Sequence, residues 1–418
     1  MKVLFICLDY YPYNGACAKL LDNLFQSGNM KQMLDDIHVL TIKKGFDECD
    51  TEKINGITVH RCFLPSMVSK KYISCMFAKN PFLAVYYTII KVFDSINAKI
   101  MGKKLYINKF VEKTIVKKLK QLHNENYDVL IPVCGKYEAG VAALKFIKNT
   151  SSKMVVYQLD PCANNYTFSS LLKGYKERIE NDLFEKAAAI ITTPILYRYI
   201  CEKYSASIIK KTESMEFPNV KVDYCDNHSK DYHSDYNCVY AGALYSFARN
   251  PRYTIEVFKT IENPKIKLHF IGVNKTQLCD YIDEKEERFI VHGIMPFDET
   301  KTKLEQADVL VNIGNIMANQ VPSKIFEYIS TGKPIINICA NSNCPSKEYL
   351  DKYPMALSIV EDEGMLNEHA YELEKFILEY AGKAVDKNKI MKQFEKCTPE
   401  YCANQMCGML TNVLNNRC

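Results

Sequence analysis

The segment VPSKIFEYISTGKP, residues 321–334, brings residues that could bind an anion and a sugar into one short stretch. It predicts a helix over 324–331, with Ser323 as its N-cap and Gly332 at its C′ position. The first turn of such a helix offers unpaired backbone N–H groups and a positive dipole end to an anion such as a diphosphate. Lys324 adds a point charge, and Glu327 could accept hydrogen bonds from the hydroxyls of a ribose or sugar. An ordinary helix between two strands would carry the same capping residues without a ligand.

Glycines follow the strands that are predicted in the second half of the chain. The apolar runs predict five strands, at 237–244, 266–273, 288–294, 308–314 and 334–339. Four of them end in or near a glycine, namely Gly242, Gly272, Gly293 and Gly314. A glycine at the carboxyl end of a strand lets the backbone turn sharply and approach a ligand closely. We therefore expect a nucleotide-binding crevice along this edge of a sheet, with Gly242 in its lining.

Arg249 and Asp160 are the candidates for charge stabilisation and proton transfer. Arg249 lies in a loop-like stretch, where it could clamp a diphosphate and support its departure in place of a metal ion. The alternative is a surface arginine at a helix start, and Arg252 is a weaker candidate for the same role. Asp160 ends an apolar run and could orient or deprotonate an acceptor hydroxyl, although Asp-Pro is also a common turn start.

The loop after the first strand carries Asn14 and Gly15. A lone glycine in such a loop is a weak signal, and without a G-x-G-x-x-G motif a dinucleotide cofactor is not supported. The histidines show no metal-binding spacing, so we expect neither a metal nor another cofactor. The 17 cysteines include no C-x-x-C pair and lie mostly in apolar runs, which favours buried free thiols.

Length and composition indicate a globular protein of more than one domain. The chain has 418 residues, 47% of them hydrophobic and 25% charged. The apolar start of the chain is too short for a signal peptide, and no run approaches the roughly 18 apolar residues of a membrane-spanning helix. We therefore expect a cytoplasmic protein.

Residues 66–122 are strongly basic. They hold twelve lysines against Asp94 and Glu112, a net charge of +10 in a chain whose total is +5, which leaves −5 for the remainder. Aromatic and aliphatic residues are interleaved with the lysines, a pattern that suits an anionic membrane surface. The alternative is a solvated lysine face on long helices. Nucleic acid is not expected, because no RNA-binding signature accompanies the charge.

Alternating apolar runs and helical patterns predict parallel α/β architecture throughout. In the first half we expect strands at 2–9, 37–43, 59–65, 128–134, 154–160 and 189–194, and helices at 16–27, 82–121, 137–149, 169–187 and 195–204. The prediction is two Rossmann-like domains facing across a cleft, 1–214 and 237–394, joined by a linker at 215–236. A C-terminal helix at 395–418 is expected to cross back to the first domain.

Several of these elements match a known family in order along the chain. The pattern P-S-K-x-x-E-Y-x-x-x-G-K-P at 322–334 resembles the donor-binding region of GT-B glycosyltransferases, in particular the retaining family-4-like group. VYAGAL with ARNP (239–251), FPNV (217–220) and DYYPYNGACAKLLDNL (9–24) are similar to further elements of that family. The resemblance is strongest between 237 and 340.

The resemblance implies a glycosyltransferase that moves a sugar from a nucleotide-sugar donor to an acceptor hydroxyl, with retention. The second domain would bind the donor and the first a glycan or other saccharide acceptor. If residues 66–122 contact a membrane, we expect a lipid-linked saccharide as the acceptor, used in surface polysaccharide assembly on the inner face of that membrane. The family usually carries a glutamate where Asn319 stands and often an arginine where Ala243 stands. These departures leave two alternatives open, another GT-B chemistry such as a nucleotide-sugar 2-epimerase, and a non-catalytic scaffold subunit.

Overall fold

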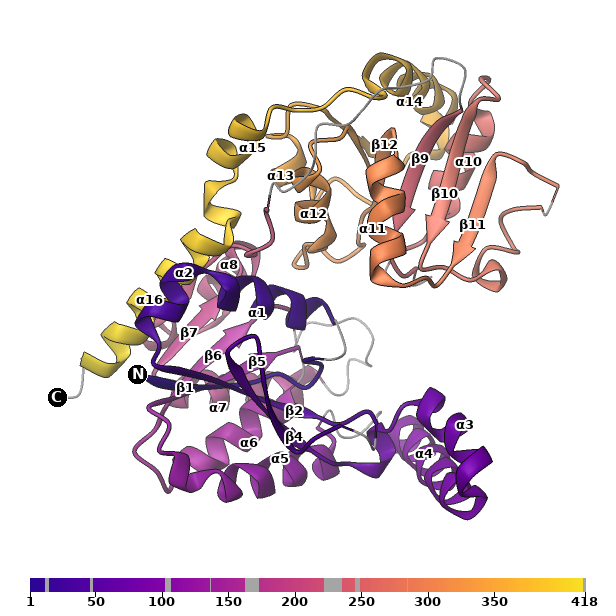
Figure 1. Cartoon of the computed structure of the whole chain (residues 1–418). Helices are drawn as coiled ribbons and strands as arrows, with labels where there is room; N and C mark the ends of the chain where they lie inside the picture. The colour runs from indigo at the N-terminus through magenta and orange to yellow at the C-terminus, as the bar shows by residue number, and fades with distance from the viewer. Residues whose placement is uncertain are drawn as a thin grey trace. The chain divides into compact units, whose positions relative to one another are not determined.

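The chain folds into two compact α/β units (Figure 1). The computed structural model describes residues 1–11, 15–45, 48–101, 107–135, 137–161, 173–221, 235–244, 249–283 and 285–415, apart from the side chains of 71, 94–101 and 297. The first unit comprises residues 1–218 and 399–418, and the second comprises 219–398. The division after Pro218 falls inside the predicted linker, of which residues 222–234 lie outside the described residues.

The first unit is built on an eight-stranded sheet in the order β3-β4-β2-β1-β5-β6-β7-β8. All neighbouring strands are parallel except β3 and β4. The strands are β1 (Lys2–Ile6), β2 (Asp36–Ile42), β3 (Thr51–Ile54), β4 (Ile57–Cys62), β5 (Val129–Cys134), β6 (Lys153–Gln158), β7 (Ala189–Thr192) and β8 (Thr212–Ser214). The central strands are buried apolar runs, as expected for a parallel sheet covered on both faces.

The helices of the first unit are α1 (Ala16–Gln26), α2 (Gly28–Met33), α3 (Lys70–Lys79), α4 (Pro81–Met101), α5 (Lys109–Gln121), α6 (Tyr137–Ile147), α7 (Lys173–Lys186), α8 (Pro194–Lys203), α9 (Ala206–Lys210) and α16 (Pro399–Asn415). Helix α16 packs against α1, α2, β6 and β7, so the C-terminal helix returns to the first unit as predicted. Its Cys402 and Cys407 are buried free thiols, in agreement with the expectation for the apolar runs.

The second unit is built on a six-stranded sheet in the order β11-β10-β9-β12-β13-β14, with every pair parallel. Its strands are β9 (Tyr236–Ala241), β10 (Ile266–Ile271), β11 (Phe289–Gly293), β12 (Val309–Ile313), β13 (Ile335–Cys339) and β14 (Ala356–Val360). Its helices are α10 (Arg252–Thr260), α11 (Phe297–Gln306), α12 (Lys324–Ser330), α13 (Lys347–Leu350), α14 (Leu366–Tyr380) and α15 (Lys387–Gln393). The two parallel sheets confirm the predicted fold class.

The prediction of one helix over 82–121 is wrong. These residues form α4 and α5, and α5 begins anew at Asn108, whose side chain accepts hydrogen bonds from the backbone N–H groups of Phe110 and Val111 at 3.0 and 3.4 Å. An asparagine N-cap starts a helix because its side chain satisfies N–H groups that have no partner in the first turn. Helix α3 was not predicted, nor were the strands β3, β8 and β14.

The missed strand β3 pairs with β4 through a tight turn at Asn55 and Gly56. Both residues have positive φ, +52° and +85°. Asn-Gly is the preferred pair for such a two-residue hairpin turn. The hairpin was overlooked because TEKI is polar and lies at the edge of the sheet, where half of its side chains are exposed.

Candidate functional site

The carboxyl ends of β9 and β10 approach each other closely in the second unit. A Cβ atom on Gly272, whose φ is +83°, would lie 3.1 Å from the carbonyl oxygen of Gly242. A Cβ on Gly242 would lie 3.0 Å from the Tyr240 hydroxyl and 3.6 Å from Nη1 of Arg249. Gly272 is therefore required by its backbone conformation and its close approach to Gly242, whereas at Gly242 a side chain would fit only if Tyr240 shifted slightly. The predicted role of Gly242 in binding a ligand remains a prediction.

Arg249 is held in place by neutral groups. Its Nε and Nη2 donate to Oδ1 of Asn315 at 3.1 and 2.8 Å, and its Nη1 donates to the carbonyl oxygen of Ala243 at 3.3 Å. Asn315 follows β12, and its own amide nitrogen donates to the carbonyl oxygen of Gln320 at 3.3 Å. Within the part of the chain that the structure describes, no carboxylate forms an ion pair with Arg249. The guanidinium is thus oriented at the carboxyl ends of β9 and β12 without losing its positive charge.

Helix α12 places Ser323, Lys324 and Glu327 in one turn, as the sequence predicts. The expectation that the Ser323 side chain caps the helix is wrong, because Ser323 already has helical angles of −58° and −19° and its hydroxyl makes no capping hydrogen bond. The chain enters α12 through a turn that is tighter than an α-helical turn. The Ile325 N–H donates to the carbonyl oxygen of Pro322 at 3.2 Å, and the Phe326 N–H donates to the carbonyl oxygen of Ser323 at 3.3 Å. Gly332 has φ +74° just past the helix, as the C′ prediction requires.

Asn219 connects the start of the second unit to the N-terminal turn of α12. Its side-chain amide donates to the carbonyl oxygen of Ser323 at 3.1 Å and reaches Oε1 of Glu327 at 3.5 Å. The side chain is buried, whereas Ser323, Lys324 and Glu327 are half-buried. Asn219 belongs to FPNV, a segment whose sequence does not indicate that its asparagine contacts α12, so this positioning residue was not predicted.

Tyr328 fixes the other side of the same helix. Its buried hydroxyl accepts a hydrogen bond from the backbone N–H of Ala241, at the end of β9, at 2.9 Å. Burial raises the pKa of the Tyr328 hydroxyl. The residue after Glu327 therefore ties α12 to β9.

Asn319 occupies the turn between β12 and α12. Its Oδ1 is buried and has no hydrogen-bond partner among the described residues. A buried carbonyl oxygen without a partner is unusual in a folded protein and needs an explanation. A hydroxyl or amide group of a bound ligand would satisfy it.

Glu361 is a further titratable group at this edge that the sequence analysis missed. It follows β14, and its backbone N–H donates to the carbonyl oxygen of Cys339 at 2.9 Å. Burial raises the pKa of its carboxyl to about 7, against the opposing effect of the nearby Arg252. A carboxyl group with a pKa near neutrality can both give and take a proton.

In the first unit, Asp160 and Gly15 lie at the carboxyl edge of the larger sheet. Oδ2 of Asp160 lies 3.7 Å from the position of a Cβ on Gly135, the residue after β5. Burial, and next the negative charge of Asp160, raise the pKa of the Cys17 thiol in the first turn of α1. Gly15 precedes α1, and a Cβ there would lie 3.2 Å from the Cβ of Asp9. Asn14 lies outside the described residues.

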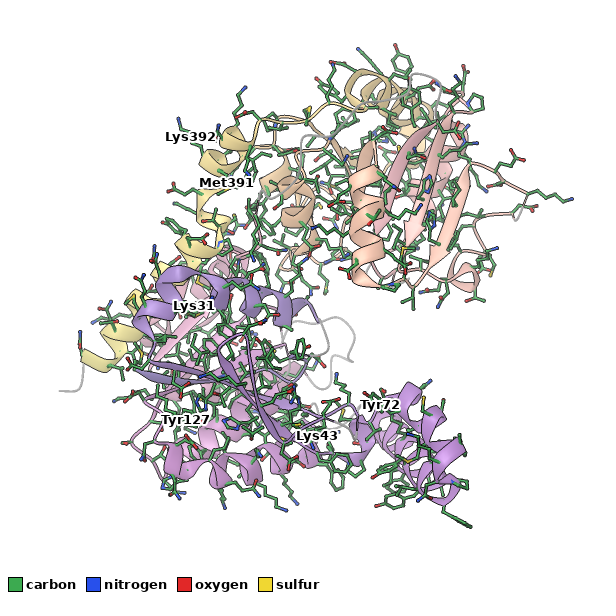
Figure 2. All side chains as sticks on the ribbon, in the orientation of Figure 1. Lys31, Lys43, Tyr72, Tyr127, Met391 and Lys392 are labelled. Atoms are coloured by element: carbon green, nitrogen blue, oxygen red, sulfur yellow. The ribbon has the colours of Figure 1, made fainter. Side chains whose placement is uncertain are left out.

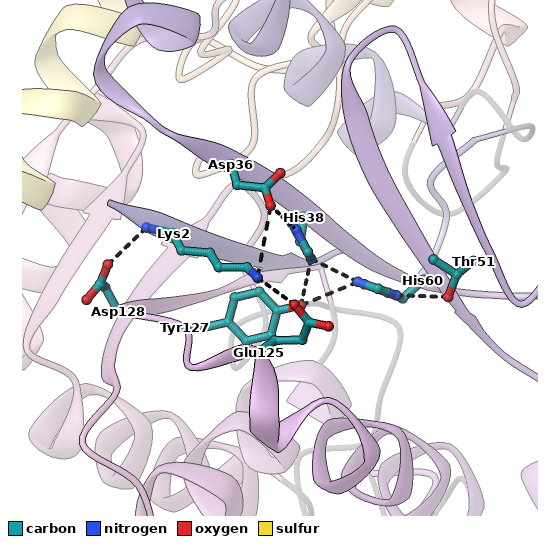
Figure 3. A network of polar contacts seen from close by, with 8 residues as sticks. All are labelled: Lys2, Asp36, His38, Thr51, His60, Glu125, Tyr127 and Asp128. Carbon is teal, nitrogen blue, oxygen red and sulfur yellow. Dashed lines mark hydrogen bonds and ion pairs between the residues drawn. The ribbon is translucent and has the colours of Figure 1, made fainter.

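A separate polar network lies toward the amino ends of β1, β2 and β4 (Figure 3). His38 contacts Asp36 at 2.7 Å, Tyr127 at 2.7 Å and His60 at 2.9 Å, and His60 contacts Thr51 at 3.0 Å. Burial, reinforced by the neighbouring His38, lowers the pKa of His60 to about 4. The network is at the opposite end of the strands from Asp160 and Gly15, so we assign it to stability.

The described residues contain neither a metal-binding cluster nor a membrane-spanning helix. Within the described ranges, no three His, Cys, Asp or Glu side chains are grouped closely enough to hold a metal ion. None of the helices described is long and apolar enough to cross a membrane.

The chain is similar over nearly its whole length to solved glycosyltransferase structures. Sucrose-phosphate synthase from Thermosynechococcus elongatus matches with a TM-score of 0.64 at 13% identity, covering 99% of each chain. The lipopolysaccharide outer core galactosyltransferase WaaB matches with a TM-score of 0.56 at 13% identity, also covering 99% of each chain. Anabaena HepE, solved in complex with UDP-glucose, matches with a TM-score of 0.61 at 11% identity, covering 99% of this chain and 100% of that one.

The chain has the GT-B fold. At these identities the similarity concerns the fold, and no protein-family model and no curated protein matches the sequence. In this GT-B chain, the donor-side candidates Gly242, Arg249, Asn319, Ser323, Lys324 and Glu327 all lie on the loops and helix start that follow β9 and β12. The acceptor-side candidates Gly15 and Asp160 lie in the other unit.

Proposed function

We propose that this chain is a glycosyltransferase that moves a sugar from a nucleotide-sugar donor to an acceptor hydroxyl, with retention of configuration. The observation that carries the proposal is Arg249, a guanidinium oriented by Asn315 and Ala243 but paired with no carboxylate among the described residues. A cation held in this way at the carboxyl ends of β9 and β12 suits the diphosphate of a nucleotide sugar. The GT-B fold supports this interpretation, since solved structures that share it are glycosyltransferases.

On the donor side, each candidate has a distinct task. Arg249 would stabilise the negative charge that develops on the diphosphate as the sugar leaves. Lys324 and Ser323, at the start of α12, would contact the same diphosphate. Glu327 would accept hydrogen bonds from ribose or sugar hydroxyls, and Asn319 would use its unpartnered Oδ1 for another hydroxyl. In a retaining reaction of this kind the departing phosphate can take the proton of the attacking hydroxyl, so no protein nucleophile is needed.

On the acceptor side we propose Asp160, with Gly15 and Asn14 in the neighbouring loop. The Asp160 carboxylate would orient the acceptor hydroxyl or accept its proton. We propose a lipid-linked saccharide as the acceptor, used in the assembly of a surface polysaccharide. The chain would then work in the cytoplasm, at the inner face of a membrane.

Incubation of the purified protein with a panel of nucleotide sugars tests this function. Slow release of the free nucleotide and sugar, followed by chromatography, is expected from a transferase without its acceptor. Loss of this release in Arg249→Ala, with retention in Arg252→Ala, would locate the reaction at the proposed site. Failure to bind any nucleotide in calorimetry would refute both the transferase and any other donor-dependent enzyme.

Glu361 favours a nucleotide-sugar 2-epimerase as the second candidate function. Its carboxyl has a pKa of about 7 and lies at the carboxyl edge of the same sheet. An epimerase needs additional acid–base groups near the sugar, and we propose Glu361 as such a group. The same incubation separates the two enzymes, because an epimerase changes the configuration of the sugar, whereas a transferase releases the nucleotide. A non-catalytic scaffold would neither change the sugar nor release the nucleotide.

A further inference from the structure

Helices α3 and α4 form a hairpin that lies outside both large hydrophobic cores of the protein. They enclose a small core of their own, made of Val68, Ile73, Ala84 and Tyr87. The hairpin is attached at its base, where the Ser69 N–H donates to the carbonyl oxygen of Lys44 at 2.8 Å. The Tyr72 ring packs there against Gly45, at the position labelled in Figure 2.

Over residues 81–93, helix α4 is apolar on its exposed face as well as on its inner face, unlike an ordinary surface helix. The side chains of Phe82, Tyr86, Ile89 and Phe93 follow one face at spacings of four, three and four residues, and they are 88%, 53%, 61% and 63% exposed. Val85 and Val92 extend this stripe, and Phe77 of α3 is also exposed. A surface helix normally buries its apolar stripe against the core. Contiguous apolar patches of this kind mark interaction surfaces.

The charge around this stripe has one sign. Residues 69–93 contain four lysines and no acidic residue. Lys70 and Lys79 lie at the two ends of α3, and Lys91 lies on the inner side of α4, where burial lowers its pKa. An apolar, aromatic face bordered by cations matches a membrane interface with anionic headgroups. A second copy of the same chain would bring like charges together, which disfavours self-association.

Helix α5, by contrast, has the polarity of a normal surface helix. Its Val111, Ile115 and Leu119 are buried in the main core of the first unit, and its Lys113, Lys117 and Lys120 are exposed. These three lysines therefore form a solvated face. Of the two alternatives for residues 66–122, the solvated lysine face fits α5, and the membrane surface fits α3 and α4.

We propose that the α3–α4 hairpin is a docking surface for an anionic lipid membrane, with Phe82, Ile89 and Phe93 inserted among the lipids. The inference deepens the proposed function, because it supplies the contact with a membrane that a lipid-linked acceptor requires. Lys70 and Lys79 would lie at the level of the headgroups.

Vesicle flotation with the full-length protein tests the proposal. We expect binding to vesicles rich in phosphatidylglycerol and much weaker binding to vesicles of phosphatidylcholine alone. The combined variant Phe82→Ser, Ile89→Ser and Phe93→Ser should lower the bound fraction about tenfold. The matched control is Ile294→Ser with Tyr371→Ser, which removes two exposed apolar side chains from the second unit and should bind as the original protein. Lys70→Gln with Lys79→Gln should weaken binding and reduce its dependence on salt.

Three outcomes would overturn the proposal. Unchanged flotation of the triple variant would do so, as would equal loss in the control. The third outcome is that the original protein is a dimer in size-exclusion chromatography and does not bind vesicles, whereas the triple variant is a monomer. A melting temperature close to that of the original protein would show that the variants remain folded. Donor hydrolysis in vesicle-free buffer should be unaffected by these changes, so failure of docking is distinguishable from failure of the proposed reaction.

Discussion

At the scale of single residues, Arg249 and Asn315 form the unit on which the proposed chemistry depends. Two guanidinium nitrogens share one amide oxygen, and the third donates to a backbone carbonyl. An ion pair would have neutralised the arginine, whereas these neutral acceptors fix its direction and keep its charge. An anion that binds there meets a cation that is already oriented.

We predict that Arg249→Ala lowers the kcat/KM for donor hydrolysis by about 100-fold, the usual effect of removing one group that stabilises developing charge. Steady-state kinetics would measure it. Arg252→Ala is the matched control, because Arg252 is an arginine three residues away that is ion-paired with Glu256 and Glu363. An equal effect of the two substitutions would contradict the role given to Arg249.

Asn319 allows a test that separates binding from stability. Its Oδ1 has no protein partner within the described residues, so Asn319→Ala should leave the free energy of unfolding within about 0.5 kcal/mol of the original. Donor affinity in calorimetry should fall by about tenfold, because a ligand hydroxyl loses its acceptor. Unaltered affinity of Asn319→Ala would remove Asn319 from the donor site.

Asn315→Ala should instead reduce kcat/KM as Arg249→Ala does, since the substitution removes the amide oxygen that orients the Arg249 guanidinium.

At the scale of elements, the short helix α12 depends on its neighbours for its position. Tyr328 ties it to β9, Asn219 contacts its first turn, and Ser330 accepts a hydrogen bond from the Lys221 N–H at 3.0 Å. Seven residues form too few hydrogen bonds to make a helix stable in isolation. The orientation of Glu327 therefore follows from these tertiary contacts.

Tyr328→Phe should destabilise the second unit by about 1–3 kcal/mol, because the Ala241 N–H would be left buried without its partner. Urea unfolding would measure the change. Tyr371→Phe, at a side chain that is 70% exposed, is the control and should be neutral. A neutral Tyr328→Phe would mean that water replaces the hydroxyl.

The elements with strong apolar patterns could be predicted from the sequence. The elements and site residues that were predicted wrongly or missed have physical explanations. Buried parallel strands such as β1, β9 and β12 are continuous apolar runs, and in the sequence a glycine directly follows β9 and β12. One helix was predicted over 82–121 because lysines and apolar residues alternate throughout this stretch. Asn108, which caps α5, does not interrupt that alternation. Asn219 and Glu361 could not be found from spacing, since long-range packing brings them to the edge of the sheet.

At the scale of the whole molecule, the described residues of each unit include a pair of buried or half-buried histidines. In the first, Nδ1 of His38 lies 2.9 Å from Nε2 of His60. In the second, the rings of His269 and His292 stack with their centroids 5.2 Å apart, and Nδ1 of His269 lies 2.9 Å from Nε2 of His292. Burial and the neighbouring histidine lower the pKa of both His60 and His269 to about 4. Acid therefore acts on one such histidine in each unit, His60 in the first and His269 in the second.

We predict that stability falls as the pH drops from about 6.5 to about 4. The unfolded chain takes up protons at its histidines from pH 6.5 downward, whereas folded His60 and His269 resist protonation until about pH 4. Over this window the unfolded state binds more protons, so His60 alone would lower the free energy of unfolding by on the order of 3 kcal/mol. Thermal melting across this range would measure it. His60→Gln should flatten the dependence, and the same change at exposed His123 should not.

Helix α16 also determines the order in which the chain can fold. The second unit, residues 219–398, is continuous in sequence, whereas the first lacks α16 until residues 399–415 have been made. During synthesis, β6, β7, α1 and α2 therefore leave the ribosome long before the helix that covers them. We expect the first unit to persist as an open intermediate that attracts chaperones, while the later-made unit closes ahead of it.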